Sequence, residues 1–390
     1  MKEEKSQVSL IASTNKIDNL EGAKKFCQDR ARTCYSGKSL EEIKAESYNE
    51  GLIKRLEKSG HHSPFDHFKV SLELNFPKAF MMLLNNERNY DTGEKSARYT
   101  KMENVAPHQK RLYNKWLEIF KFGIKENYPE ESFPSLYKKP KNQEAQFVKL
   151  AQENARYLTS VFTPTRMEHT ISLRQLNVVS NFMKDFVEEH ESGSNRFKSR
   201  LADSCIDFLG SEVVRSFSIP EIKGKANRQL GLFGERVEEI FGKDIYSANQ
   251  EISFACFAQL QRHRTLGYHI NEWEGNISFS GLYIPPMVSA LNKESEWIDD
   301  ISDVSTYDFP QGQKISVSEM GQSRDLYAKT RERICGQTQL EAARATVDMV
   351  NRYARVHPEF SDWKLPDCAE GPCEKGGCIF GKSNHLERLI

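Results

Sequence analysis

The chain has 390 residues, enough for two or three domains or for one kind of domain used twice. Hydrophobic residues make up 38% and charged residues 28%, with Lys plus Arg equal to Asp plus Glu at 55 each, a composition typical of a globular protein with an ample core. The charge balance excludes a generally basic surface that would hold nucleic acid through its phosphates, so an anionic ligand would need a local cluster of basic side chains.

The N-terminal sequence MKEEKSQVSLIAS has no apolar stretch long enough for a secretory signal. No apolar run in the chain approaches the roughly 20 residues that span a bilayer, so we expect no association with a membrane. Five of the eight cysteines are scattered, mostly in apolar or helical surroundings, as free thiols in a reducing compartment are: Cys27, Cys34, Cys205, Cys256 and Cys335. We therefore predict a cytoplasmic protein.

The first half combines predicted helices with one clear strand. Residues 21–60 predict two helices, because apolar residues recur at three- and four-residue intervals and a glycine closes each segment. GHHSPFDH has the composition of a turn, and FKVSLELNF then alternates as a half-buried strand does. FPKAFMMLLNNERNY predicts a helix that begins after Phe76, and further helices are predicted at 107–128, 143–160 and 170–190.

The polar sequence ESGSNRFKS leads into a second half that repeats part of this order. GLFGERVEEIFG predicts a short helix, EISFACFAQLQRHR an apolar strand or helix that ends in charge, and GLYIPPM a turn. Residues 293–315 are polar and predict a loop, whereas residues 324–356 predict the longest helix of the chain. MMLLNNER and FAQLQRHR each run from apolar into polar residues, which predicts a divergent duplication with parts at 1–225 and 226–390.

A first cluster of polar groups lies in DTGEKSARY, which we interpret as a loop with backbone N–H groups that can face an anion. Ser96 and Arg98, with Glu94 beside them, could form a phosphate cradle, because serine and arginine next to exposed amides are typical of one. Arg88 could add a second positive charge. A solvated helix end with surface charges is the alternative interpretation.

A second cluster is denser, because Arg262, His263 and Arg264 directly follow the apolar FACFAQLQ. Burying an arginine without a partner is costly, so these groups need carboxylates or a bound anion. A pyrophosphate or a flavin would suit three convergent donors. An arginine-rich helix end paired with acidic neighbours is the alternative.

Two groups of residues could hold a metal ion. His61, His62 and His67 lie near Asp66, but a Ser-Pro turn prevents the i, i+4 alignment of a helical zinc site, so turn-stabilising histidines are the better interpretation. The Gly- and Pro-rich tail could supply three thiolates and an imidazole to Zn²⁺, or could carry free surface thiols, through Cys368, Cys373, Cys378 and His385. We predict no resident metal, with the tail as the weak candidate.

Taken together, the two clusters resemble the signature R-H-R-x-x-S-x-N-E-x-S-x-R-Y of the flavin-dependent thymidylate synthase family. NERNYDTGEKSARY keeps the later positions of that signature, namely Arg88, Glu94, Ser96, Arg98 and Tyr99. QRHRTLGYHINEW keeps the opening positions, namely Arg262, His263 and Arg264. Each half therefore retains what the other has lost.

Other motifs of the family occur in its order along most of the chain. ARTC at 31–34 and GHHSPFDH at 60–67 match its early elements, and Arg156 with PTR at 164–166 matches a later one. Gln259 lies three residues before the second cluster, where the family has a nucleotide-contacting glutamine. RERICGQTQLEAAR resembles its late R-x-x-x-x-x-Q-x-E helix through Arg333, Gln339 and Glu341, and the GPC…GGC tail resembles the cysteine-bearing C-terminus of some members. A surface ion-pair ladder along one helix face would also explain Arg333, Gln337 and Glu341.

The resemblance implies an α/β (α+β) fold with an antiparallel sheet flanked by long helices, occurring as two divergent repeats. It implies conversion of dUMP to dTMP with FAD, NADPH and 5,10-methylenetetrahydrofolate. Residues 1–225 would provide the nucleotide half and residues 226–390 the flavin half. The family's active sites lie between the subunits of a homotetramer, so we expect a homodimer of tandem chains here.

Residue roles follow from the same resemblance. FAD would be held by Ser63, Arg262, His263 and Arg264. The nucleotide would be held by Arg88, Glu94, Ser96, Ala97, Arg98, Arg156 and Gln259. Arg333 would act in catalysis, because a guanidinium beside the uracil ring favours its N3-deprotonated, more nucleophilic form.

Two alternatives stay open. The chain could be a related flavin-dependent methylase or hydroxymethylase of another pyrimidine nucleotide such as UMP, because the substituted positions Asp91, Gly93 and Gly267 lie where such a change could occur. It could also be a nucleotide-binding homologue that has kept the fold and lost catalysis.

Overall fold

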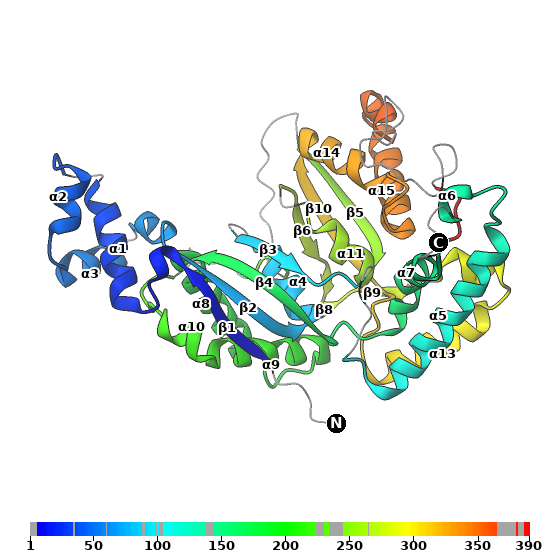
Figure 1. Ribbon diagram of the computed structural model, residues 1–390, viewed down its shortest axis with the longest axis horizontal. Coiled ribbons are helices and arrows are strands. Elements are labelled where there is room, and N and C mark those ends of the chain that lie inside the picture. The colour runs from blue at the N-terminus through cyan, green and yellow to red at the C-terminus, as the bar shows by residue number, and fades with distance from the viewer. Residues whose placement is uncertain are drawn as a thin grey trace. The chain divides into compact units, whose positions relative to one another are not determined.

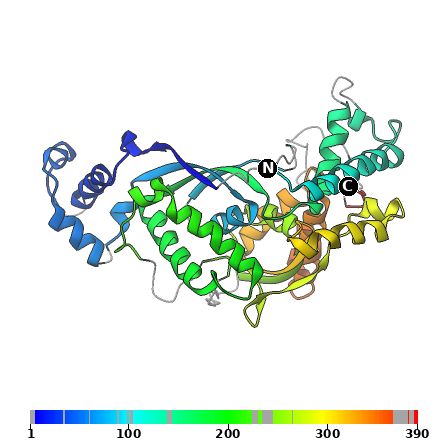
Figure 2. The ribbon, with the colours of Figure 1, turned by 90° about the horizontal axis from the view of Figure 1, so that it is seen from below.

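The computed structural model describes residues 6–33, 36–59, 61–87, 90–97, 100, 104–137, 143–223, 230–233, 245–263, 265–364, 380 and 386–390. These residues form two compact units of helices and antiparallel sheet, which confirms the predicted fold class (Figures 1 and 2). Unit 1 is Met1–Lys95 with Pro164–Gly234, and unit 2 is Ser96–Thr163 with Glu235–Ile390.

The predicted division of the chain after residue 225 needs a correction. Residues 96–163 were expected in the first part, but they pack with the C-terminal residues in unit 2. Their helix α5 (Pro107–Asn127) supplies apolar side chains to the core of that unit, which no local pattern in the sequence could indicate.

The sheet of unit 1 has the strand order β1 (Gln7–Ser13), β2 (Lys69–Pro77), β4 (Pro164–Ser172), β3 (Tyr90–Glu94), and all of its pairs are antiparallel. In β2 every second side chain is buried, as the alternation of FKVSLELNF predicts. β3 corrects the prediction that DTGEKSARY is a loop, because residues 90–94 pair with β4.

The helices of unit 1 are α1 (Leu20–Thr33), α2 (Leu40–Ala45), α3 (Glu50–Ser59), α4 (Lys78–Asn86), α8 (Leu173–His190), α9 (Arg196–Gly210) and α10 (Glu212–Ser216), with 3₁₀ turns η1 (Thr14–Lys16) and η2 (Ser63–Asp66). Helices α8, α9 and α10 lie along one face of the sheet in both views (Figures 1 and 2).

Two helix predictions in this unit were partly wrong. Residues 21–60 form three helices rather than two, because Ser39 caps a separate short helix with its side chain and Glu42. The helix predicted from residue 170 begins at Leu173, because the preceding residues extend β4, and the Ser172 side chain caps its first turn by accepting from Gln175 N at 3.1 Å.

The sheet of unit 2 contains β5 (Ile245–Ser253), β10 (Gln313–Gln322) and β6 (Gly267–Ile270) in that order, and β9 (Phe279–Leu282) also pairs with β10. A separate hairpin joins β7 (Glu272–Trp273) to β8 (Asn276–Ile277). The helices and 3₁₀ turns of unit 2 are α5, α6 (Pro134–Tyr137), α7 (Gln143–Ala155), η4 (Arg156–Leu158), α11 (Phe254–Leu260), α12 (Pro286–Ala290), α13 (Glu294–Tyr307), α14 (Ser323–Arg333), α15 (Leu340–Ala354) and η5 (Pro358–Lys364).

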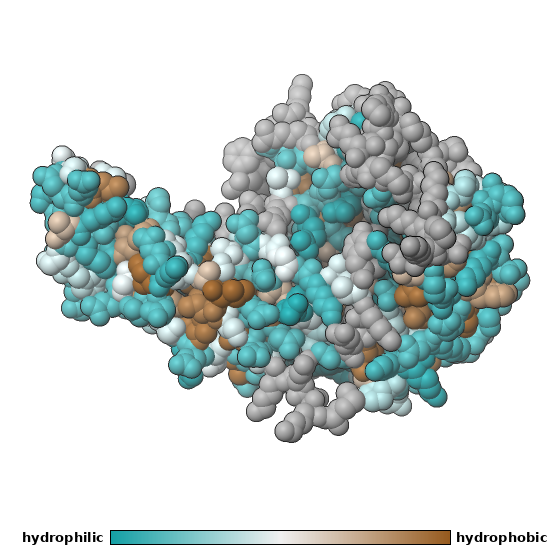
Figure 3. All heavy atoms as spheres, in the orientation of Figure 1, coloured by the Kyte–Doolittle hydropathy of each residue, from teal (hydrophilic) through white to brown (hydrophobic). Residues whose placement is uncertain are grey.

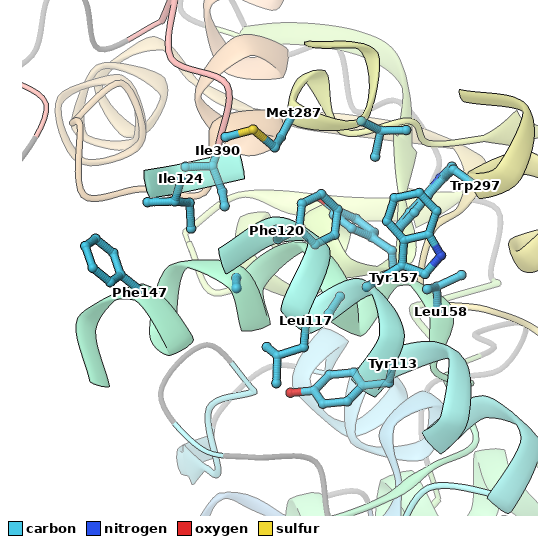
Figure 4. Close-up of a cluster of buried hydrophobic side chains, with 14 of the residues drawn as sticks. Tyr113, Leu117, Phe120, Ile124, Phe147, Tyr157, Leu158, Met287, Trp297 and Ile390 are labelled. Carbon is cyan, nitrogen blue, oxygen red and sulfur yellow. The ribbon is translucent and has the colours of Figure 1, made fainter. Parts of the chain in front are cut away.

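A core of buried side chains lies between α5, α7, α12 and α13 of unit 2 (Figure 4). Trp116 and Trp297 are fully buried and meet edge to face with ring centroids 4.8 Å apart, and Trp116 Nε1 donates to Asp300 at 2.7 Å. The loop predicted at 293–315 is therefore wrong, since α13 occupies most of it. Most of the polar residues of α13 are exposed, while Trp297, Ile301 and Val304 form a narrow apolar stripe at helical spacing.

The long helix predicted at 324–356 is two helices, α14 and α15, separated by residues 334–339. Gly336 lies in the break, where a glycine weakens helical structure. Among the described elements α5, with 21 residues, is longer than either of them.

The two units share an order of elements. In unit 1 a central strand, helix and short strand (β2, α4, β3) are followed by a second central strand and helix (β4, α8). In unit 2 the corresponding order is β5, α11, β6, then β10 and α14. In each unit the two central strands pair with each other, and the short strand pairs with the second of them. A duplication would produce this shared order of elements. Common descent of the two units stays a prediction.

The face of the molecule shown in Figure 3 is mostly hydrophilic where residues are described, with scattered apolar patches. No helix within the described ranges is long and apolar enough to cross a membrane.

Candidate functional site

Two predicted functional residues are in direct contact in unit 2. Arg333, the last residue of α14, donates from Nε to Nε2 of His263 at 2.7 Å. Only a tenth of the His263 side chain is exposed, and the Glu332 carboxylate lies 3.7 Å from its Nε2. Burial, together with the charges of Arg333 and Lys329, lowers the pKa of His263 to about 3. The ring is therefore neutral near pH 7, and an Nε2 that accepts a hydrogen bond leaves its proton on Nδ1.

A second group meets at Gln339, which precedes the first turn of α15. Its side-chain oxygen accepts from the guanidinium of Arg156 and from Nε2 of Gln259, and its own Nε2 donates to the Tyr157 hydroxyl. Arg156 is 5% exposed, so it is a buried charge that needs such partners. Gln259 and His263 are four residues apart, and both groups therefore meet at the C-terminal end of α11.

Glu341 anchors this second group. Its carboxylate accepts from the backbone N–H of Ser253 at 2.8 Å, from the Ser253 hydroxyl at 2.6 Å and from the Tyr157 hydroxyl at 2.8 Å. Burial raises the pKa of Glu341, while these donors act in the opposite direction. The predicted surface ladder through Arg333, Gln337 and Glu341 is wrong, because Glu341 is buried and Gln337 lies between α14 and α15.

A buried ion pair fixes α14 to the strand β10. Lys329 Nζ lies 2.8 and 2.6 Å from the two carboxylate oxygens of Glu319, and both side chains are almost fully buried. The Tyr246 hydroxyl and the Gln250 amide also donate to Glu319. The pair joins α14 to the central strand β10 four residues before Arg333. Sequence analysis missed it, because a lysine and a glutamate ten residues apart across a strand–helix junction form no recognisable pattern.

Several buried polar atoms at the end of α11 could bind a ligand. Gln259 Oε1 and both side-chain polar atoms of Gln261 are buried and have no hydrogen-bond partner among the described residues. Such atoms are costly unless something pairs with them. Amide groups beside arginine and a neutral histidine suit the carbonyl and imide edge of a flavin or a pyrimidine, so the residues present fit the cofactor that the family resemblance implies.

In unit 1 the predicted nucleotide-binding residue Glu94 ends strand β3. It forms an ion pair with Lys78 and accepts from Asn85 Nδ2 at 3.3 Å, with only 4% of its side chain exposed. Of the phosphate cradle expected beside it, Arg88, Arg98 and Tyr99 lie outside the described residues. Ser96 begins a turn in which its carbonyl accepts from Thr100 N at 3.0 Å, and Ala97 follows within that turn.

The motif GHHSPFDH is a turn held by its own polar groups. Ser63 is exposed at the start of η2, and His62 Nε2 lies 2.8 Å from the Glu57 carbonyl oxygen. Asp66 accepts from the Ser172 hydroxyl at 2.9 Å and from Arg174 at 2.8 Å, which ties the turn to the start of α8. No group of His, Cys, Asp and Glu suited to a metal occurs in the part of the chain that the structure describes. Cys368, Cys373, Cys378 and His385 lie outside that part.

The end of α4 in unit 1 corresponds to the end of α11 in unit 2, but different chemistry is present there. Asn86 and Glu87 stand where α11 continues into Arg262 and His263. Glu87 accepts from the backbone N–H of Gly231 at 2.6 Å, and a Cβ at Gly231 would lie 3.2 Å from the same carboxylate. The chain's own residues 230–233 therefore occupy this position in unit 1.

The structure thus brings together Arg156, Gln259, His263 and Arg333 in unit 2, and it places Ser63 and Glu94 in unit 1. Arg262 lies beside His263 and is half-buried, and Arg264 is outside the described residues. Tyr157 and Ser253 are polar members of the site that sequence analysis missed. The N-cap position of Ser253 before FACFAQLQ was the available signal for one of them.

The neutral His263 predicts a dependence of stability on pH. The unfolded chain protonates this ring near pH 6.5 and the folded chain only near 3, so the stability that the neutral ring confers is complete above pH 6.5 and is lost as the pH falls. We expect a loss of about 2 kcal/mol between pH 7 and pH 5. His263→Gln should remove most of that loss in urea unfolding, whereas the exposed His67→Gln should not. Equal slopes in all three proteins would contradict the assignment.

Comparison with known proteins identifies a family for part of the chain. Residues 16–185 match the family model described as thymidylate synthase complementing protein. Among solved structures, a UMP/dUMP methylase PolB from Streptomyces cacaoi bound with 5-Br dUMP is 18% identical, with 45% of this chain and 77% of that chain covered and a TM-score of 0.30. The same methylase bound with 5-Br UMP gives 18% identity, 45% and 76% coverage and a TM-score of 0.26. No curated protein sequence matches the chain.

Proposed function

Residues 16–185 belong to the thymidylate synthase complementing protein family, and on this premise we propose that the chain is a flavin-dependent C5-methylase that converts dUMP to dTMP. The observation that carries the proposal is the convergence in unit 2 of four residues from three separate segments, namely η4, the end of α11 and the end of α14. Each of them was predicted to bind the nucleotide or the flavin, or to act in catalysis: Arg156, Gln259, His263 and Arg333. Arg156 and Gln259 meet at Gln339, and Arg333 meets His263 four residues after Gln259.

Arg333 is the proposed catalytic residue. A guanidinium held beside a pyrimidine stabilises negative charge that develops on the ring. The hydrogen bond to neutral His263 engages the Nε edge of Arg333 and fixes the plane of its guanidinium without charge repulsion. Lys329 and Glu319 hold α14 to β10, so the position of Arg333 follows from a rigid part of the unit.

Bound FAD would supply the reducing equivalents and carry the one-carbon unit between 5,10-methylenetetrahydrofolate and the pyrimidine. We propose that Arg262, His263 and Arg264 hold the flavin, with Ser63 from unit 1. Gln259 and Arg156 would hold the nucleotide together with residues of the first half, namely Arg88, Glu94, Ser96, Ala97 and Arg98. NADPH would be the reductant, and two chains would form the functional dimer.

The proposal requires no nucleophilic cysteine. Burial raises the pKa of Cys27 to about 12 and also raises those of Cys205 and Cys256. These three thiols therefore stay protonated at neutral pH, and a thiol in that state is a poor nucleophile.

The visible spectrum of the purified protein tests the flavin. We expect flavin absorbance after addition of FAD, at one flavin per chain, because residues 230–233 occupy the corresponding position in unit 1. Arg262→Ala should lower the occupancy, and Lys223→Ala, on the surface of unit 1, should leave it unchanged. Protein that stays colourless with added FAD would overturn the proposal.

Release of tritium from 5-³H-labelled nucleotide, with methylenetetrahydrofolate and NADPH present, tests the reaction and its substrate. Release from dUMP is the expected result. Release from UMP alone would assign the chain to a different pyrimidine nucleotide, and bound flavin without release from either would indicate a binding protein that has lost catalysis.

A further inference from the structure

A continuous chain of hydrogen bonds crosses the buried part of unit 2 from Glu341 to Gln259. Glu341 accepts from Tyr157, the Tyr157 hydroxyl accepts from the amide of Gln339, and the oxygen of Gln339 accepts from Gln259 and from Arg156. The first and last members come from helices α15 and α11, and Tyr157 is fully buried.

The groups at both ends of this series of hydrogen bonds require the same donor-to-acceptor direction along it. The two Glu341 oxygens accept hydrogen bonds from Ser253 and from the Tyr157 hydroxyl, so the Tyr157 proton points to Glu341 and the Tyr157 oxygen accepts from an N–H of Gln339. At the other end a guanidinium only donates, so the oxygen of Gln339 must face Arg156. The amide orientation of Gln339 is therefore the same whichever end is considered first.

The orientation of Gln339 in turn sets that of Gln259. Because the oxygen of Gln339 faces Gln259, only the NH₂ group of Gln259 can point toward it, and Oε1 of Gln259 must point elsewhere. That oxygen is buried and has no hydrogen-bond partner among the described residues. Glu341, acting through two intervening side chains and in the same direction as Arg156, thus determines that Gln259 offers an acceptor rather than a donor.

We propose that Glu341 is a positioning residue that acts through Tyr157 and Gln339 to present Gln259 Oε1 to the bound ligand as a hydrogen-bond acceptor. The ligand must then offer an N–H or O–H at that point, as the imide of a uracil or of an isoalloxazine ring does. The identity of the ligand rests on the proposed function, whereas the direction of the hydrogen bonds does not.

Exchanging the carboxylate and the amide of positions 341 and 339 gives a specific test. In Glu341→Gln the new amide donates to the Tyr157 oxygen, so either Gln339 turns its NH₂ group toward Arg156 or a donor loses its partner. In the double variant Glu341→Gln with Gln339→Glu, the new carboxylate at position 339 accepts from Tyr157, Arg156 and Gln259. The total charge and the outward orientation of Gln259 Oε1 are then both restored.

Urea unfolding without any ligand tests the hydrogen-bonded series Glu341–Tyr157–Gln339–Gln259, called the relay below. Each single variant should unfold at a lower urea concentration than the wild type, and the double variant should recover most of the loss, a coupling that independent sites do not show. Asp348→Asn, which removes an exposed carboxylate from the same helix α15, is the control and should change nothing. Additive losses in the double variant would overturn the relay.

The affinity for ligands then tests whether the relay presents Gln259 Oε1 as a hydrogen-bond acceptor. Titrations with FAD alone and with dUMP alone should show about 5- to 100-fold weaker binding of one of the two by Glu341→Gln, and recovery in the double variant. The ligand that is affected is the one that Gln259 contacts. Unchanged affinities for both, with a coupled stability, would overturn the positioning role alone. A wild type that binds neither FAD nor dUMP would overturn the proposed function and the positioning role, while the stability measurements would still decide the relay.

Discussion

Arg333→Ala is expected to lower the turnover number for dUMP by about 100- to 1,000-fold, the usual effect of removing one preorganised group that stabilises developing charge. Arg333 ends α14 and is held by His263, so the truncation removes a positioned guanidinium and leaves most of the packing of the helix intact. The measurement is the rate of tritium release at saturating dUMP.

Two further variants make this result specific. Arg331→Ala removes another guanidinium from the same helix, which lies over the Tyr327 ring. Turnover should stay within about twofold of the wild type, because single substitutions near the surface have small effects. Arg333→Lys should recover only part of the rate, because an ammonium keeps the charge but loses the planar donor edge that meets His263. Equal losses in the variants at positions 331 and 333 would show that Arg333 acts through the stability of α14.

Lys329→Met is expected to lower the free energy of unfolding of unit 2 by about 3–5 kcal/mol, because it leaves the buried carboxylate of Glu319 without its counter-charge. Lys329 and Glu319 are 0% and 1% exposed, so water cannot replace the lost partner. The measurement is urea unfolding followed by tryptophan fluorescence, because all four tryptophans of the chain belong to unit 2.

The double variant Lys329→Met with Glu319→Gln is the matched control. The amide that replaces the Glu319 carboxylate has no charge to leave uncompensated. It keeps one acceptor oxygen for the Tyr246 hydroxyl, and its NH₂ group can donate to the Gln250 oxygen once that amide is turned. The double variant should therefore be substantially more stable than Lys329→Met alone. A double variant as unstable as the single one would show that packing of the lysine stem, rather than its charge, supports α14.

Structure that depends on short-range periodicity could be predicted from consecutive residues alone. The alternation of FKVSLELNF predicted β2, and the apolar stripe of FPKAFMMLLNN predicted α4, because side-chain period and burial are properties of a few consecutive residues. Periodicity did not reveal α13, where three buried apolar residues among many acidic ones were too few to outweigh the overall polarity. It also merged α14 with α15, because both helices carry helix-forming residues and the break between them is short.

The chemistry of the site was predictable by residue type, but its assembly was not. The family motifs pointed to Arg156, Gln259, His263 and Arg333 before any contact was known. Arg156 and Gln259 meet at Gln339, which is 183 residues from Arg156 in the sequence. His263 meets Arg333 across 70 residues, and the order of the segments along the chain carries no sign of either contact. Tyr157 and Ser253 belong to the site only because folding brings η4 and the end of β5 to α15.

Residue identity and local periodicity thus determined which groups this protein has for chemistry and most of the elements that carry them. Only the tertiary structure decided that segment 96–163 joins unit 2, that Glu341 is buried rather than on the surface, and that His263 is neutral. The physical reason is the same in each case. Burial and charge environment depend on every segment that packs against a residue, and the sequence around that residue describes only one of them.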